Sequence, residues 1–252
     1  GLEPTVINGG IINNTETNFY IGSGDIVVAE ADESDNSFVK LPSDIAVITN
    51  IDSEHLDFYG SYDHLKESFF RYIDQLPSDG FGVLCTDNAE VKYLLKKLGH
   101  KEVVTYGFDG EPDVKAINIK QKDFGYSFDV VCSKKFNNQT IKNVFTTIPG
   151  VHNVKNSLAA VAIALKLSIK GEDIIKGISN FSGVQRRFTI TGKKNGVTFV
   201  DDYAHHPEEI VATLSAAKNI LTSTGGKLFV VFQPHKYTRL RDLFDRFAKS
   251  FS

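Results

Sequence analysis

The sequence predicts an α/β fold built on a mostly parallel sheet, and three observations lead to that prediction. Two apolar runs, at 26–29 and 45–48, each stop at an acidic cluster, as buried parallel strands do where they reach a ligand-binding edge. Strand and helix patterns alternate along 62–106, and β-rich segments follow at 114–148. We therefore expect a parallel sheet with a small antiparallel β flap beside it.

The elements of this first unit follow from periodicity and turn signals. Apolar side chains at helical spacing predict a helix over 62–76, and the turn Pro77-Ser78-Asp79-Gly80 ends it. An Ala- and Leu-rich stretch predicts the best-defined helix, over 153–167. The remaining expected elements are a strand at 81–85, a helix at 89–98, a strand at 103–106, β segments at 114–119, 126–131 and 141–148, and a helix at 171–181.

A domain boundary is expected near Gln185, which divides the chain into a central unit, 1–184, and a second unit, 185–252. The second unit shows the strand and helix order of a partial Rossmann-like domain. Its expected elements are strands at 188–191 and 197–201, a helix at 207–221, a strand at 228–232 and a helix at 238–251.

Composition limits the possible partners. The chain has 252 residues, 41% of them hydrophobic, which is enough for a sizeable core and two domains. A formal net charge of -3 and the lack of a basic run argue against nucleic acid and an anionic membrane as partners. The two cysteines, Cys85 and Cys132, lack metal-ligand spacing and indicate a reducing compartment.

The acidic clusters at 29–35 and 49–57 allow two interpretations. Carboxylates beside an imidazole at a sheet edge suit a divalent cation that carries nucleotide phosphates. Asp and Ser are also the usual helix starters, so each cluster alone could be an N-cap and a solvated loop.

Three other polar groups are ambiguous from the residues alone. The imidazole and amides of His152, Asn153 and Asn156 could cap a helix or face an adenine edge. The fork of Arg187 suits a γ-phosphate but could form a surface ion pair, which is the role we expect for Arg186. The pair at 205–206 lacks further ligands for zinc and precedes an ordinary helix start at Pro207.

Six ordered blocks then reveal a resemblance. They are AEADESD (29–35), TNIDSEHLDFYG (49–60), PGVHNVKN (149–156), GVQRRF (183–188), VDDYAHHP (200–207) and FQPHKYTRLRDLFDRF (232–247). Together they resemble the Mur ligase family, and within it the branch that joins L-alanine to UDP-N-acetylmuramate, the first stem-peptide step of peptidoglycan synthesis. The resemblance implies ATP and Mg²⁺ as cofactors, the two small molecules as partners, a monomer or homodimer, and a bacterial cytoplasm.

The resemblance also assigns roles by position. It implies a metal held by Glu30 and His55, which with Arg187 form the catalytic set. It implies nucleotide contacts by His152, Asn153, Asn156, Arg187 and Asp202, and substrate contacts by Tyr203, His205, Arg239 and Arg241. Lys236 stands where the family pattern has Arg, and a point charge replaces a bidentate fork there.

The family pattern further implies that the chain is a piece of a longer enzyme. It contains no G-x-x-x-x-G-K-[ST] phosphate loop, so we expect an N-terminal domain, that loop and the end of the C-terminal domain to be missing, and the piece alone to be inactive. The alternatives are a sister ligase that attaches a recycled tripeptide to the same nucleotide sugar, and a non-catalytic nucleotide-binding fragment. Folylpolyglutamate synthetase fits less well, because it lacks the blocks at 200–207 and 232–247.

Overall fold

The structure, a computed structural model, describes residues 2–251, apart from the side chains of residues 223 and 224. Its centre is a six-stranded sheet in the order β4-β5-β6-β7-β8-β9. β4 to β7 run parallel, and β8 and β9 continue the sheet in antiparallel pairing. The strands are β4 (Ile45–Ile48), β5 (Phe81–Cys85), β6 (Val103–Gly107), β7 (Val114–Lys122), β8 (Gly125–Cys132) and β9 (Thr140–Thr146).

This sheet confirms the predicted α/β class and refines one detail. The three β-rich segments were expected as a flap beside the main sheet, whereas β7 pairs directly with β6. The antiparallel strands therefore share one hydrogen-bonded sheet with the parallel ones, and on one face of the sheet the same core cluster includes side chains of both.

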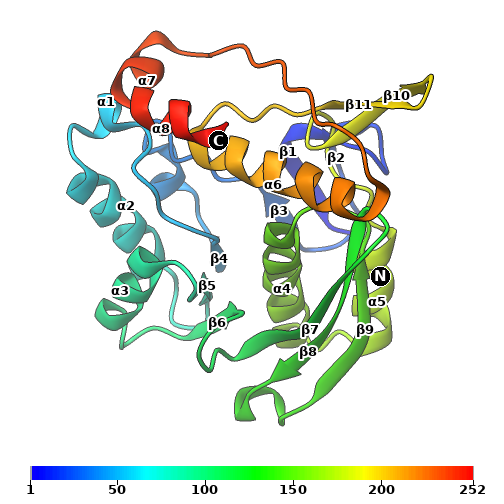
Figure 1. Ribbon diagram of the computed structural model, residues 1–252. Helices are drawn as coiled ribbons and strands as arrows, with labels where there is room; N and C mark the ends of the chain where they lie inside the picture. The colour runs from blue at the N-terminus through cyan, green and yellow to red at the C-terminus, as the bar shows by residue number, and fades with distance from the viewer. Residues whose placement is uncertain (1, 252) are drawn as a thin grey trace.

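Helices cover both faces of the sheet (Figure 1). Successive side chains of a strand point to opposite faces, so Val83 packs into the core that includes Leu158 of α4, and Leu84 packs into the core under α2 and α3. The helices of this unit are η1 (Ser37–Lys40), α1 (Leu56–Tyr59), α2 (Tyr62–Asp74), α3 (Ala89–Lys97), η2 (Lys134–Phe136), α4 (Val151–Lys166) and α5 (Gly171–Asn180).

The strand expected at 26–29 exists as β3 (Val27–Ala29), but the prediction that it is buried is wrong. It pairs only with β1 (Thr5–Ile12), in a separate three-stranded sheet with β2 (Thr17–Tyr20). Val27 is 63% exposed. No other strand in the described part of the chain pairs with its free edge. The hydrophobic side chains of β3 therefore stay exposed although their sequence is that of a buried strand. The strands β1 and β2 were not predicted from the sequence.

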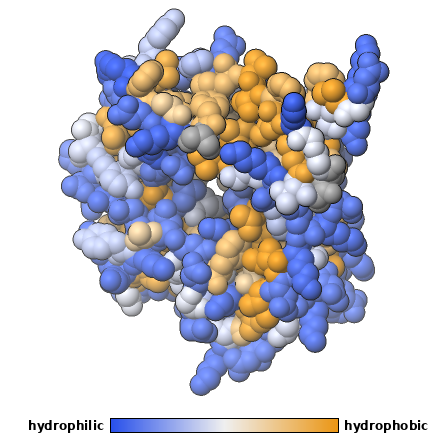
Figure 2. All heavy atoms as spheres, viewed as in Figure 1, coloured by the Kyte–Doolittle hydropathy of each residue, from blue (hydrophilic) through white to orange (hydrophobic). Residues whose placement is uncertain are grey.

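The second unit departs from a Rossmann-like order. β10 (Thr189–Lys194) and β11 (Val197–Asp201) form an antiparallel hairpin, and α6 (Pro207–Thr224) follows. The strand expected at 228–232 is coil, because no described strand pairs with its backbone, and Val231 is fully exposed. Figure 2 shows apolar side chains gathered at the top of the view, where the coil between α6 and α7 runs.

The last helix is also divided. Instead of one helix at 238–251, α7 (Tyr237–Asp242) and α8 (Phe244–Ser250) meet at Leu243, whose backbone leaves the helical region with φ -118° and ψ 21°. This break lets α8 turn back against α6 (Figure 1). Within residues 2–251, no helix is both long enough and apolar enough to cross a bilayer.

Candidate functional site

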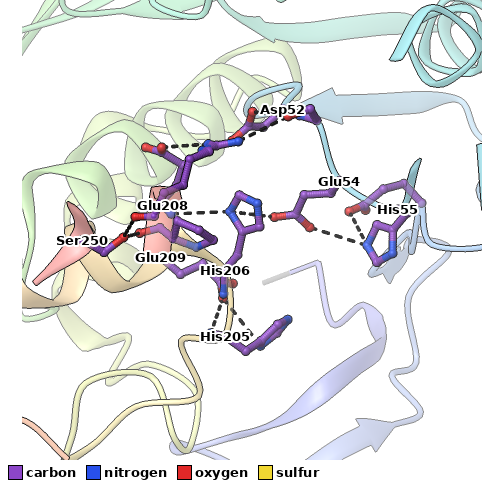
Figure 3. A network of polar contacts seen from close by, with 12 residues as sticks. Asp52, Glu54, His55, His205, His206, Glu208, Glu209 and Ser250 are labelled. Atoms are coloured by element: carbon purple, nitrogen blue, oxygen red, sulfur yellow. Dashed lines mark hydrogen bonds and ion pairs between the residues drawn. The ribbon is translucent and has the colours of Figure 1, made fainter. Parts of the chain in front are cut away.

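Two carboxylates and an imidazole meet between the loops that follow β3 and β4. Glu33 lies on the first loop, and Glu54 and His55 lie on the second. His55 Nε2 is 3.7 Å from Glu33 Oε1 and 3.5 Å from Glu54 Oε2. Ligand atoms of all three lie within 4.8 Å of one another. We call these residues the acid–imidazole group (Figure 3 shows two of them, Glu54 and His55).

The electrostatics of this group favour a cation. Burial, together with repulsion from Glu209 and Glu33, raises the pKa of Glu54 to about 7. Burial lowers the pKa of His55, which keeps a nitrogen lone pair free for a ligand. Carboxylate oxygens and a neutral imidazole form a donor set that Mg²⁺ or Mn²⁺ accepts, and a bound cation would relieve the repulsion between the carboxylates.

The second unit reaches this group through the start of α6. His206, which is 1% exposed, places Nδ1 3.2 Å from Glu54 Oε1. Burial lowers the pKa of His206 to about 4, so its ring is neutral near pH 7. The Glu54 side chain therefore lies between two imidazoles, one from each unit (Figure 3).

Local sequence explains why α6 begins here. His206 is the N-cap residue, Pro207 occupies the first helical position, and Glu209 completes a capping box, as the predicted helix start required. The Glu209 carboxylate accepts the backbone N–H groups of His205 and His206 and an N–H from Arg187 at 3.2 Å. Although burial alone would raise it, these bonds and charges hold the pKa of Glu209 below its usual value.

A second cluster of predicted residues surrounds a pocket of about 200 Å³ at the carboxyl ends of β4, β5 and β6. His152 and Asn156 line it. The pocket therefore lies at the sheet edge where nucleotides bind in open α/β folds. Its lining is Thr49, Asn50, Cys85, Asp87, Asn88, Tyr106, His152, Lys155 and Asn156.

The amides beside this pocket do not cap α4, which contradicts the capping interpretation. Gly150 is the N-cap and has no side-chain bond to the helix. The Asn153 amide instead donates to the Pro149 carbonyl at 2.7 Å, and the Asn156 amide donates to Asn153 Oδ1 at 3.1 Å. Burial lowers the pKa of His152, which keeps its ring neutral.

Asp202 lies near this second cluster. Its carboxylate accepts the backbone N–H groups of Phe188 and Ala204, both at 2.8 Å. Burial lowers the pKa of His152, and the negative charge of Asp202 partly opposes this effect. Asp202 thus joins the backbone before β10 to the backbone after β11.

The predicted substrate residues are only partly brought together. The Tyr203 and His205 rings lie edge to face with centroids 4.8 Å apart. Burial raises the pKa of Glu54 and lowers that of His55, and the positive charge of Arg239 opposes the first shift and adds to the second, so Arg239 lies in the neighbourhood of the acid–imidazole group. Arg241 is exposed and its guanidinium bonds the neighbouring Asp242 at 2.6 Å.

The side chains of Glu30, Arg186 and Lys236 each contact a partner outside the acid–imidazole group. The Glu30 carboxylate accepts the backbone N–H of Gly9 at 2.6 Å and is not one of the acid–imidazole group, so its predicted metal role stays a prediction. Arg186 pairs with Asp201 at 3.3 Å, which confirms the ion pair expected for it. Lys236 lies 3.7 Å from Asp57.

Sequence reasoning missed four residues at this site. Glu33 and Glu54 fall inside the quoted acidic clusters but were not singled out, and His206 was set aside with the zinc hypothesis. Arg246, which contacts the loop that carries Glu54, received no role. The available signal was the density of carboxylates around His55 in the block TNIDSEHLDFYG.

Comparisons with known proteins identify the family of this chain. The Mur ligase middle domain matches residues 13–164, and the Mur ligase glutamate ligase domain matches residues 186–252. The chain is 48% identical over 252 residues to the UDP-N-acetylmuramate--L-alanine ligase of Brucella ovis, and 49% identical over 254 residues to that of Mesorhizobium japonicum. Each alignment covers 100% of this chain and 54% of the relative, so the chain spans about half the length of these proteins.

Solved structures show the same fold. The UDP-N-acetylmuramate-alanine ligase of Thermotoga maritima superposes with a TM-score of 0.80 at 27% identity, over 100% of this chain and 53% of that one. A murein peptide ligase of Psychrobacter arcticus superposes with a TM-score of 0.67 at 22% identity, over 93% of this chain and 52% of that one. Matching domains over most of its length and relatives close to half identical show that this chain belongs to the Mur ligase family.

Proposed function

We propose that the protein of which this chain forms part joins L-alanine to UDP-N-acetylmuramate at the expense of ATP, in a bacterial cytoplasm. The observation that carries the chemistry is the contact between the acid–imidazole group and His206 of the second unit, with the charge of Arg239 close enough to act on Glu54 and His55. The choice of substrates is supported by relatives 48% and 49% identical across the chain that bear the name UDP-N-acetylmuramate--L-alanine ligase.

The acid–imidazole group is the proposed site of a divalent cation. Glu33, Glu54 and His55 would hold it, with Glu30, the residue directly after β3, as a further proposed ligand. When bound, Mg²⁺ would supply positive charge for the oxygens of the reacting carboxylate and phosphate. This chain's own part is to keep two partly buried carboxylates and a neutral imidazole facing one point.

The nucleotide is proposed to occupy the pocket at the carboxyl edge of the sheet. A carboxamide can pair with an adenine edge through two hydrogen bonds, a role that suits Asn153 and Asn156 beside the neutral His152. Asp202 would accept ribose hydroxyls, and Arg187, at the junction of the two units, would face the γ-phosphate.

The proposed reaction has two steps. The muramate carboxylate attacks the γ-phosphoryl group of ATP and forms an acyl phosphate with release of ADP. The amine of L-alanine then attacks the acyl carbon, and phosphate leaves. Both steps depend mainly on positioning and charge neutralisation, so residues that fix two units against each other matter as much as those that touch substrate. Tyr203, His205, Arg239 and Arg241 are the proposed contacts to the muramoyl group and the amino acid.

Phosphate release tests this proposal. The whole gene product would be incubated with ATP, Mg²⁺ and UDP-N-acetylmuramate, and L-alanine or the recycled tripeptide would be offered in separate reactions. We expect turnover with L-alanine and a loss of at least about 100-fold in His55→Ala, since that change removes a ligand of the proposed cation. Glu30→Gln and Glu54→Gln, compared side by side, decide which carboxylate accompanies His55.

Other outcomes have definite meanings. Turnover with the tripeptide alone would assign the protein to the sister ligase. No turnover with either acceptor would leave a nucleotide-binding protein without this chemistry. His100→Ala is the control, because its exposed side chain, before β6 begins, pairs with Asp74 at the end of α2, and its loss should leave turnover within about 2-fold.

A further inference from the structure

Arg246, on α8 of the second unit, bonds three acceptors that belong to two different elements. Its Nη2 is 3.1 Å from Asp52 Oδ2 and 2.9 Å from Glu208 Oε1, and its Nη1 is 3.3 Å from Ser53 Oγ. Asp52 and Ser53 lie on the loop after β4. Glu208 lies in the first turn of α6 and is joined to Asp52 through Arg246; Figure 3 labels Asp52 and Glu208. One guanidinium fork therefore joins α8, the start of α6 and a loop of the central unit.

The loop that Arg246 holds is the one that carries two members of the acid–imidazole group. Asp52 and Ser53 directly precede Glu54 and His55. Asp52 also shapes the loop internally, since its carboxylate accepts the backbone N–H of Ser53 at 2.7 Å and its carbonyl accepts that of Glu54 at 2.8 Å. A displacement of Asp52 would consequently move the backbone from which Glu54 projects.

A second contact supports the same loop from the same side. His206 Nδ1 lies 3.2 Å from Glu54 Oε1, and Ser250 Oγ of α8 donates to the Pro207 carbonyl, next to His206. The start of α6 and the helix α8 thus form one packed support, which meets loop 52–55 at Asp52, Ser53 and Glu54.

We propose that Arg246 is a positioning residue that couples the second unit to the acid–imidazole group, and that it holds loop 52–55 in the shape that binds a divalent cation. This inference rests on the proposed function for the identity of the site. It goes beyond that function because it assigns part of the cation affinity to a helix that supplies no ligand.

The direction in which cation affinity changes when Arg246 is removed distinguishes a positioning role from a purely electrostatic one. Arg246 carries a positive charge close to a cation site, so its charge alone repels the cation, and removal of that charge would tighten binding. A positioning role predicts the opposite, because a loop freed from Arg246 loses order at Glu54 and His55. Arg246→Lys keeps the charge and lacks the planar fork needed to bond Asp52, Ser53 and Glu208 together.

The test measures Mn²⁺ binding to this chain by electron paramagnetic resonance, in which free and bound Mn²⁺ are distinguished without turnover. Removal of residues that orient metal ligands typically weakens affinity by about 10- to 100-fold. We expect the low end, about 10-fold, for Arg246→Ala, because Arg246 bonds Asp52 and Ser53 and not the proposed ligands themselves. Arg246→Lys should bind about 3-fold more weakly than the unaltered chain, since a single donor restores part of the bridge. Arg71→Ala is the matched control: it removes the same charge from an exposed side chain of α2 that bonds Ser68 of the same helix, and affinity should not change.

A double-mutant cycle with Asp52→Asn completes the test. If the Arg246–Asp52 bond is the link, the two changes together weaken binding less than the product of their separate effects. Tighter or unchanged binding in Arg246→Ala, with circular dichroism matching the unaltered chain, would overturn the proposal. So would the absence of Mn²⁺ binding in the unaltered chain, whereas the ligase function is judged separately by phosphate release with Mg²⁺.

Discussion

Asp87 provides the sharpest test of how the sheet edge is built. Its side chain is 7% exposed and follows β5, yet it holds the turn that follows β6. The carboxylate accepts the backbone N–H groups of Phe108 at 3.0 Å and Asp109 at 3.1 Å, and Lys155 Nζ of α4 lies 3.4 Å away. Asp87→Ala would remove all of these contacts together.

The expected loss of stability follows from the two backbone N–H groups that Asp87→Ala leaves without their acceptor. A hydrogen bond to a charged group contributes about 1.5 to 3 kcal/mol, and two N–H groups lose such a bond. Because the Asp109 end of the turn is exposed and water can reach it, we take the low end and expect a loss of about 3 kcal/mol in the free energy of unfolding. For a chain of this size that corresponds to a fall of about 6 to 12 °C in Tm.

Urea denaturation followed by circular dichroism measures this loss. Asp87→Asn keeps the shape and one acceptor without the charge, and should lose about half as much, near 1.5 kcal/mol. Asp109→Ala is the control, since it truncates an exposed side chain in the same turn and leaves the backbone N–H in place. A loss below about 1 kcal/mol in Asp87→Ala would refute the reasoning, because it would mean that water replaces the carboxylate at little cost.

Three other predictions concern the core and the approach of β6 to Asp87. Leu158→Ala, at a fully buried position of α4, should cost about 3 kcal/mol in urea denaturation, whereas Leu167→Ala at the exposed end should cost less than about 1 kcal/mol; similar losses would contradict the packing described. Burial raises the pKa of Cys85 and raises that of Cys132 to about 11, so about a thousandth of the latter is thiolate at pH 8. A thiol reagent should therefore label neither in the native chain and both in denaturant, and rapid native labelling would contradict this. Gly107→Ala would place Cβ 2.4 Å from Asp87 Oδ1, so Tm should fall, and an unchanged Tm would show that the carboxylate has room to move.

Local patterns in the sequence predicted the central sheet well. Strand β5 matches the expected bounds, and α2, α3 and β6 differ from them by one or two residues, because each is defined by side chains close together in the chain. The start of α6 was predictable for the same reason, since Pro207 and Glu209 act on the first turn to which they belong. Patterns that require a distant partner were less informative. The segments at 26–29 and 228–232 are equally apolar, but one is an exposed strand and the other is coil.

The candidate site also has a part that is predictable from local sequence and a part that depends on distant contacts. The sequence alone determined that carboxylates and His55 follow the ends of two apolar runs, and that these blocks occur in the order found in Mur ligases. Only the tertiary structure decided which carboxylates reach His55. It brought Glu33 and Glu54 to the imidazole, while Glu30 bonded the backbone of Gly9.

The contribution of the second unit could not be read from the sequence at all. His206 and Arg246 lie about 150 and 190 residues after the loop that they support. Residue type and spacing report contacts within a turn of helix or a pair of neighbouring residues on a strand. Contacts between units depend on where α6 and α8 pack, which is settled by the burial of His206 and by the break at Leu243 that turns α8 toward α6.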